Sequence, residues 1–424
     1  MTGPLAGLLV VDLTRALAGP QAAMMLGDLG ARVVKVESPA GDDTRSWGPP
    51  FVAAEDGGAA ESTYFLSCNR NKESITLDLK AEGDAHVLAG LIERADVLLE
   101  NYKPGALRRL GFGAERLMAL NPRLVVLSIS GFGHDGPEAA RAGYDQIAQG
   151  EAGLMSLTGP DAAHPQRVGV PIADLLAGMN GAFGVLAALR ERDRTGRGQI
   201  VRTSLLASVV AAHAFQGTRW TVAGERGTAQ GNHHPTIAPY GLFRCAGGSV
   251  QIACGNDAMW HRLCAAFGLP ADDPRYAGNA DRVAHRDSLT ALLEAAFAPL
   301  GADELLRKLN DVGIPAGRVR TLDEVYEWEQ TRSQRLLVDV EHESLGKISL
   351  PGSALRMFTV DAAGTETEST RTAHRPPPLL NADADAIRKW LDTPRQDRPD
   401  EATVAARGVA SRRSPSRGQY GTRL

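Results

Sequence analysis

The chain has 424 residues, 43% of them hydrophobic and 23% charged, a composition typical of ordinary globular proteins. Its 46 basic and 50 acidic residues give a net charge of −4, which argues against a nucleic-acid surface as the main function. No run reaches the ~18 apolar residues of a membrane span, and the apolar N-terminal run lacks the basic start of a signal peptide. We therefore expect a cytoplasmic protein with room for two domains and with no nucleic-acid or membrane partner.

The first half of the chain alternates strands with helices. Nearly continuous apolar runs predict strands at 7–13, 32–37, 74–80, 96–101 and 124–130. Apolar residues spaced by three and four predict helices between them, at 18–31, 81–95 and 105–121. Strands that alternate with helices indicate βαβ units, so this half predicts a Rossmann-like, doubly wound α/β domain with a parallel sheet.

The second half begins with two long helices, predicted at 175–196 and 204–220, and continues through a Gly-, His- and Pro-rich loop into a smaller α+β unit. The predicted division is a large domain at 1–205, a linker at 206–230, a small domain at 231–325, a second linker at 326–345, and a return to the large domain at 346–393. Residues 394–424 are rich in arginine and poor in apolar side chains, which predicts a disordered basic tail.

The four cysteines, Cys68, Cys245, Cys254 and Cys264, show no CxxC spacing and are expected to be reduced thiols. Cys254 and Cys264 lie in apolar stretches, where a buried small hydrophobic role is more common than a nucleophilic one.

The first strand–helix turn reads "TRALAGPQ" and contains only one glycine, Gly19. A dinucleotide-binding fingerprint needs GxGxxG, so an NAD-dependent dehydrogenase is disfavoured, and a helix N-terminus able to receive an anion remains. Basic residues also stand at sheet-edge turns beside two other predicted strands, where they either hold phosphates or form ordinary surface charge; these are Arg70, Lys72, Lys80, Lys103, Arg108 and Arg109.

Asp174 is a lone carboxylate in the apolar stretch "RVGVPIADLLAGMNG". Removing a carboxylate from water costs several kcal/mol unless it is paired or hydrogen-bonded. Asp174 therefore either caps the helix that begins around it or has a raised free energy for a functional reason.

Eight stretches in order give the chain a resemblance to the family III CoA-transferases (the CaiB/BaiF group) over residues 4–393. They are "VVDLTRALAGPQAAMMLGDLGARVVKVESPAGDDTR", "NRNKESITLDLK", "LLENYKPGALRRLGF", "GFGHDGP", "AGYDQIAQG", "GVPIADLLAGM", "RTGRGQ" and "HPTIAPYGLF". The resemblance implies that Asp174 is the catalytic nucleophile, acylated in a mixed anhydride and then in an aspartyl-CoA thioester. It also implies an interlocked homodimer.

The same resemblance implies that CoA or acyl-CoA binds as a substrate, with no tightly bound cofactor and no metal. The implied CoA contacts are Leu17, Ala18, Ser38, Leu77, Asp78, Leu79, Lys80, Asn101, Tyr102, Lys103, Arg109, Tyr144 and Asp145. Ser38 stands where some members have an arginine on the nucleotide. The implied donor is succinyl-CoA and the acceptor a small carboxylic or dicarboxylic acid, which His233 and His234 are candidates to contact.

Two alternatives accompany this interpretation. A 2-methylacyl-CoA racemase needs an acid–base group on each face of the substrate, and this chain has Tyr144 where the racemases have a histidine. Tyrosine, with a pKa of ~10, is a poor base near neutral pH. A non-catalytic CoA-binding protein would keep the basic contacts but would not need Asp174.

Overall fold

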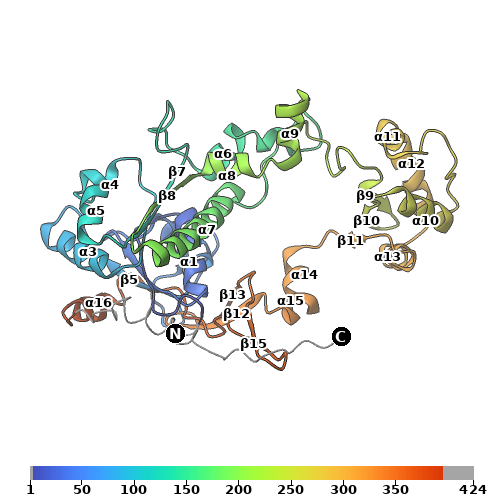
Figure 1. Ribbon diagram of the computed structural model, residues 1–424. Coiled ribbons are helices and arrows are strands. Elements are labelled where there is room, and N and C mark those ends of the chain that lie inside the picture. The colour runs from blue at the N-terminus through green and yellow to red at the C-terminus, as the bar shows by residue number, and fades with distance from the viewer. Residues whose placement is uncertain (1–2, 395–424) are drawn as a thin grey trace, which may run out of the picture.

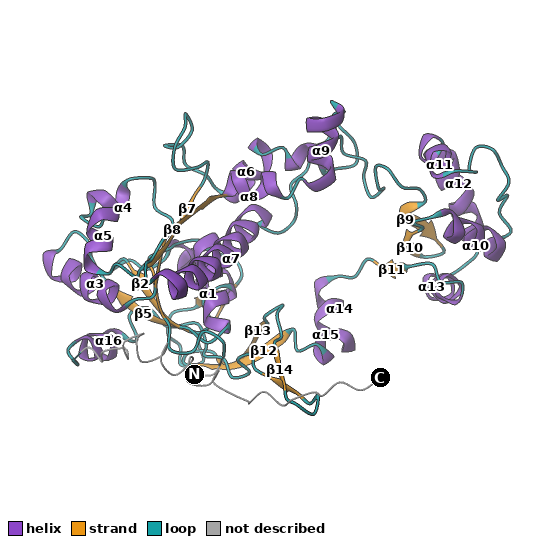
Figure 2. Cartoon of the chain, viewed as in Figure 1, coloured by secondary structure: helices purple, strands orange, loops and turns teal. Residues whose placement is uncertain are grey.

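The computed structural model describes residues 3–394, and the predicted tail at 394–424 lies outside the described residues except for its first position. The core of the large domain is a six-stranded parallel sheet in the order β5-β2-β1-β6-β7-β8 (Figures 1 and 2). The strands are β1 (Leu9–Asp12), β2 (Arg32–Glu37), β5 (Lys72–Thr76), β6 (Val97–Glu100), β7 (Val125–Ser130) and β8 (Ile200–Ser204). This is the strand order of a Rossmann fold, so the predicted doubly wound α/β domain is confirmed.

Helices cover both faces of this sheet because successive strand residues point to opposite sides. Val10 belongs to the apolar cluster on one face of the sheet, and Val11 belongs to the cluster on the other face. The first face carries α1 (Ala18–Asp28), α7 (Ile172–Thr195) and α8 (Leu205–Ala211), and the second carries α3 (Glu82–Arg94), α5 (Ala114–Leu120) and α16 (Ala384–Leu391). Each face therefore has its own apolar core.

Two predicted helices are each divided in the structure. The helix expected at 105–121 is α4 (Ala106–Arg109) followed by α5, with Gly111 between them at φ +88°. The helix expected at 204–220 is α8 followed by α9 (Ala214–Ala223). The break lies at His213, whose Nε2 is 2.7 Å from the carbonyl oxygen of Ala152, a contact that no local sequence pattern announces.

The helix α7 has the length and apolar composition of a membrane-spanning helix, but the core helices of globular proteins pass the same test. It packs against α1, α8, β7 and β8, and small residues make this contact close. A Cβ on Gly178 would lie 2.6 Å from the carbonyl oxygen of Ala18 on α1. We therefore assign α7 to the core of the large domain.

The small domain has a three-stranded antiparallel sheet with four helices, so the expected α+β class is confirmed (Figure 1). Its core includes Trp260, Leu293 and Phe297, separate from the two cores of the large domain. The elements are β9 (Tyr240–Cys245), β10 (Gly248–Ala253), α10 (Asp257–Phe267), α11 (Asn279–Ala284), α12 (Arg286–Phe297), α13 (Ala302–Asp311) and β11 (Ala316–Arg318).

After the small domain the chain returns to the large one. Two hairpins pair β12 with β13 and β14 with β15, and α16 then packs against α3 and β5. The elements of this return are α14 (Leu322–Glu327), α15 (Glu329–Ser333), β12 (Leu337–His342), β13 (Gly346–Pro351), β14 (Phe358–Val360) and β15 (Glu366–Glu368). Figure 1 shows the small domain joined to the large domain by two separate segments, one after α9 and one before α14.

Candidate active site

A pocket of about 180 Å³ lies at the carboxyl ends of β1, β6 and β7. The strand order reverses between β1 and β6, the point at which open α/β sheets bind their ligands. The lining consists of residues 15–18, 101–104, 129–131 and 141–144, together with Asp43, Trp47, Asp174 and Leu205. The loops that follow three neighbouring strands therefore meet around Asp174.

Asp174 lies in the first turn of α7, which begins at Ile172 with Pro171 as its N-cap residue. It is not the cap, so the capping interpretation of this residue is wrong. The cap comes from Asp145, whose Oδ1 accepts the backbone N–H groups of Ala173 at 2.8 Å and Asp174 at 3.3 Å.

Asp145 begins the short helix α6 (Asp145–Glu151) and is fixed through both carboxylate oxygens. Its Oδ2 accepts a hydrogen bond from Gln149 at 2.7 Å, and Gln149 in turn accepts the N–H of Val168 at 2.8 Å. Because Gln149 is fully buried, these bonds lock α6 to the segment that leads into α7.

The electrostatics of Asp174 are unusual for an aspartate. Burial, and second to it the charge of Asp145, raise the pKa of Asp174 to about 7. The N-terminus of α7 favours the charged form, but burial and the neighbouring carboxylate outweigh it. Asp174 is therefore a poorly solvated carboxylate that changes its charge near neutral pH, a property common at catalytic sites.

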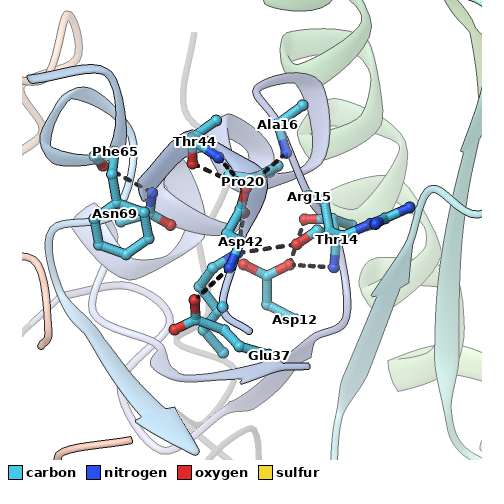
Figure 3. A network of polar contacts seen from close by, with 12 residues as sticks. Asp12, Thr14, Arg15, Ala16, Pro20, Glu37, Asp42, Thr44, Phe65 and Asn69 are labelled. Atoms are coloured by element: carbon cyan, nitrogen blue, oxygen red, sulfur yellow. Dashed lines mark hydrogen bonds and ion pairs between the residues drawn. The ribbon is translucent and has the colours of Figure 1, made fainter. Parts of the chain in front are cut away.

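The loop before α1, which supplies residues 15–18 of the pocket, is held by buried charged groups (Figure 3). Asp42 Oδ1 accepts the N–H of Ala16 at 3.3 Å, and Asp42 Oδ2 pairs with Lys35 Nζ at 2.8 Å. Lys35 Nζ also donates to the carbonyl oxygen of Thr14 at 2.9 Å. Ala16 is left-handed at φ +64°, a conformation that side-chain-bearing residues avoid unless their surroundings hold them in it.

A second buried lysine secures the other end of this loop. Lys72 Nζ contacts Asp12 Oδ2 at 2.9 Å, Asn69 Oδ1 at 2.9 Å and the carbonyl oxygen of Pro20 at 3.0 Å. Arg70 is likewise buried in an ion pair with Asp28. The hypothesis that Arg70 and Lys72 hold phosphates is therefore wrong, because both are already occupied inside the protein.

The structure brings together about half of the residues implied as CoA contacts. Those that line the pocket with Asp174 are Leu17, Ala18, Asn101, Tyr102, Lys103 and Tyr144. Those outside its lining are Ser38, Leu77, Asp78, Leu79, Lys80, Arg109 and Asp145. Ser38 directly follows β2 and residues 77–80 directly follow β5, so these positions continue along the same carboxyl edge of the sheet, where Lys80 is exposed.

Twelve of the lining residues were not predicted, and three of these have cationic or aromatic side chains: Arg15, Trp47 and Arg141. Arg15 stands next to predicted contacts in the sequence, which was a usable signal, but Trp47 and Arg141 come from loops without a motif.

The two histidines predicted to contact the acceptor acid lie outside the pocket. His234 stacks between Phe215 and Tyr240, at centroid distances of 5.5 and 5.1 Å, in the segment before β9.

His233 packs edge-on against Phe243, with ring centroids 5.8 Å apart, and neither histidine lines the pocket. Burial raises the pKa of Cys254 and of Cys264 to about 11. Both thiols therefore stay protonated near neutral pH and are poor nucleophiles, as expected from their apolar surroundings.

Comparison with known proteins shows what the chain is similar to. The family model described as CoA-transferase family III matches residues 5–384. The succinyl-CoA:glutarate CoA-transferase of Mus musculus is 40% identical over 89% of this chain and 84% of its own. The acetyl-CoA:oxalate CoA-transferase of Acetobacter aceti is 39% identical over 85% and 90%. A CAIB/BAIF family protein from Brucella suis has a crystal structure that matches 92% of this chain and 100% of its own, with a TM-score of 0.79 and 39% identity.

Proposed function

The chain belongs to CoA-transferase family III, and we propose that it moves CoA from succinyl-CoA to a small dicarboxylic acid through covalent intermediates on Asp174. The observation that carries the mechanism is the desolvated carboxylate of Asp174, with its pKa of about 7, in a pocket at the switch point of the sheet. The substrate class is supported by relatives whose names pair a CoA thioester with a dicarboxylic acid.

In the proposed reaction the Asp174 carboxylate attacks the thioester carbonyl of the donor and expels CoA thiolate, leaving a mixed anhydride. The thiolate then attacks the aspartyl carbonyl, which releases the donor acid and forms an aspartyl-CoA thioester. The carboxylate of the acceptor attacks this thioester, and CoA thiolate leaves again. In the last step the thiolate attacks the acceptor carbonyl, which yields the new CoA thioester and restores the Asp174 carboxylate.

The pocket supplies suitable surroundings for these steps. Its cationic side chains, Arg15, Lys103 and Arg141, would contact the phosphates of CoA, which binds as a substrate. Leu17 and Ala18 stand at the start of α1, where no side chain caps the helix, and their N–H groups are our proposed donors to the tetrahedral oxyanion. A site with little water also protects the anhydride from hydrolysis.

The test is to incubate the protein with succinyl-CoA, record its intact mass, and map the adduct after hydroxylamine treatment. We expect an adduct on Asp174, and loss of transfer with retained CoA binding in Asp174→Ala. The matched control is Asp193→Ala, which removes an exposed carboxylate from the other end of α7. Full transfer activity in Asp174→Ala would refute the mechanism, and CoA binding without turnover of any acid by the wild type would indicate a binding protein.

A racemase would exchange deuterium at Cα of a 2-methylacyl-CoA without any carboxylic acid acceptor. The pocket presents Tyr144 where the racemases have a histidine, and the nearby histidine in the sequence, His134, lies outside the lining and contacts Ser128 and Ser130. Burial and the charge of Arg202 also lower the pKa of His134. We expect no acceptor-independent exchange.

We further propose that the protein is a homodimer whose second copy covers the outer face of α7. Met179, Phe183 and Leu186 form an apolar stripe on this face, with exposures of 52%, 74% and 37%. A contiguous exposed apolar surface on a helix whose opposite face packs in the core is typical of an interface. Light scattering after gel filtration should give twice the chain mass for the wild type, and half of that for Phe183→Asp. A monomeric wild type would refute the proposal.

A further inference from the structure

A second pocket, of about 490 Å³, lies on the C-terminal part of the chain, between α15, β12 and the β14–β15 hairpin. Four arginines contribute to its lining: Arg332, Arg335, Arg356 and Arg371. We call it the arginine pocket. It shares no lining residue with the pocket around Asp174, and it meets α1 at the opposite end of that helix, through Asp28.

Each carboxylate that lines the arginine pocket already has a cationic partner. Glu368 is shared by Arg335 at 2.8 Å and Arg356 at 3.0 Å. These two guanidinium groups, with the hydroxyl of Thr370, hold the pKa of Glu368 at about 2, far below its usual value.

The two other acidic residues of the lining pair with cations outside it. Asp28 is bound by Arg70, and Asp339 lies 3.0 Å from Lys347. Once these partners are counted, six cations face three carboxylates, so positive charge is in excess across the pocket.

Two of the arginines have no carboxylate partner among residues 3–394. Arg371 is half-buried and donates only to carbonyl oxygens, to Ala373 at 2.8 Å and to Gly27 at 3.2 Å. Burial and the neighbouring charge of Arg375 lower the pKa of Arg371, and the charge of Asp28 offsets only part of this effect. Arg332 is exposed at the rim, and its side chain makes no ion pair within the described chain.

We propose that the arginine pocket binds a small dianion that presents carboxylate or phosphate oxygens, with Arg371 and Arg332 as its principal contacts. Guanidinium groups match both kinds of anion through paired N–H donors, and two uncompensated cations favour a charge of minus two. The volume suits a molecule of a few heavy atoms with its water. This proposal is independent of the reaction assigned to Asp174.

The experiment titrates inorganic phosphate and, separately, succinate into the full-length protein saturated with CoA, so that the pocket around Asp174 is occupied, and follows heat release by calorimetry. We expect one saturable site per chain that is weakened in the arginine-pocket variants; succinate bound equally well by those variants belongs to the acid site beside Asp174. The anion bound more tightly at the variant-sensitive site identifies the preferred chemistry. Arg371→Gln and Arg332→Gln should each raise the Kd at least fivefold. Arg332 is exposed, so Arg332→Gln should leave the fold intact. The matched control is Arg275→Gln, which changes an exposed arginine of the small domain that pairs with Asp273.

Three results would overturn the proposal. They are the absence of saturable binding of both anions, an unchanged Kd in both pocket variants, and an equal loss of binding in Arg275→Gln.

Discussion

Asparagine at position 145 removes the charge of Asp145 and keeps the hydrogen bonds that its Oδ1 accepts, although it loses the one that Oδ2 accepts from Gln149. Asn at this position keeps an Oδ1 able to accept the N–H groups of Ala173 and Asp174, so the cap on α7 should survive. The repulsion between the two carboxylates is lost. Asp145→Asn should therefore lower the pKa of Asp174 and move the acidic limb of the pH–activity profile to lower pH.

The size of this effect follows from the causes of the shift. The pKa of Asp174 is about 7, against 3.8 for an ordinary aspartate, a gap worth about 4 kcal/mol at about 1.4 kcal/mol per pH unit. Burial is the larger cause and Asp145 the second, so removing Asp145 should close less than half of the gap. The limb should then lie between about pH 5.4, the midpoint of the gap, and about 7.

The assay is kcat/KM for CoA transfer between pH 5 and 9, because this parameter reports the free enzyme. Only ionised Asp174 can attack, and at pH 6 about a tenth of it is ionised in the wild type. Asp145→Asn should thus be several-fold more active than the wild type at pH 6, whereas Asp193→Asn should match the wild type. An acidic limb that stays at pH 7, in a variant with unchanged melting temperature, would refute the electrostatic role of Asp145.

Three further outcomes are expected. Asp174→Asn should raise the free energy of unfolding at pH 8 by up to about 4 kcal/mol, measured by urea denaturation. The reason is that a carboxyl group with a raised pKa in the folded state costs stability as pH rises from 3.8 to about 7, so the gain in free energy should vanish at pH 4. Gly178→Ala should cost about 1–3 kcal/mol of stability and raise KM for the thioester, since its Cβ would lie 2.6 Å from the carbonyl oxygen of Ala18. Lys103→Met should raise KM for the CoA thioester about five- to tenfold with little change in kcat, an effect that shrinks as salt is added.

The central strands could be predicted because they are buried on both faces, so each reads as a nearly continuous apolar run. The edge strand β8 could not, because Arg202 and Thr203 interrupt its apolar pattern and four of its five residues are exposed or half-buried. The break between α8 and α9 was equally hidden, since His213 ends α8 through a contact with Ala152, 61 residues away in sequence. Sequence patterns predict elements that are buried evenly along their length. They fail where a single contact with a residue distant in the sequence determines where an element ends.

The same limit applies to the basic residues at the sheet edge. Lys72 and Lys103 both follow or begin predicted strands and look alike in the sequence. Lys72 is fully buried against Asp12, whereas Lys103 lines the pocket, and the difference arises from which loop folds over the strand end. Buried lysines that hold a binding loop and exposed lysines that hold a ligand cannot be separated without the tertiary contacts.

The two roles of Asp145 explain why the unusual charge at Asp174 was visible in the sequence while its cause was not. A helix start with an aspartate in its first turn suggests a local cap, but the cap comes from a residue 29 positions earlier. The carboxylate that satisfies the N–H groups of α7 is the same one that opposes ionisation of Asp174. Asp145→Ala should therefore lose the cap of α7, the bond from Gln149 and the pKa shift, whereas Asp145→Asn should keep the cap and lose the other two. Comparing the two variants separates the cost of losing the cap from the electrostatic effect on Asp174.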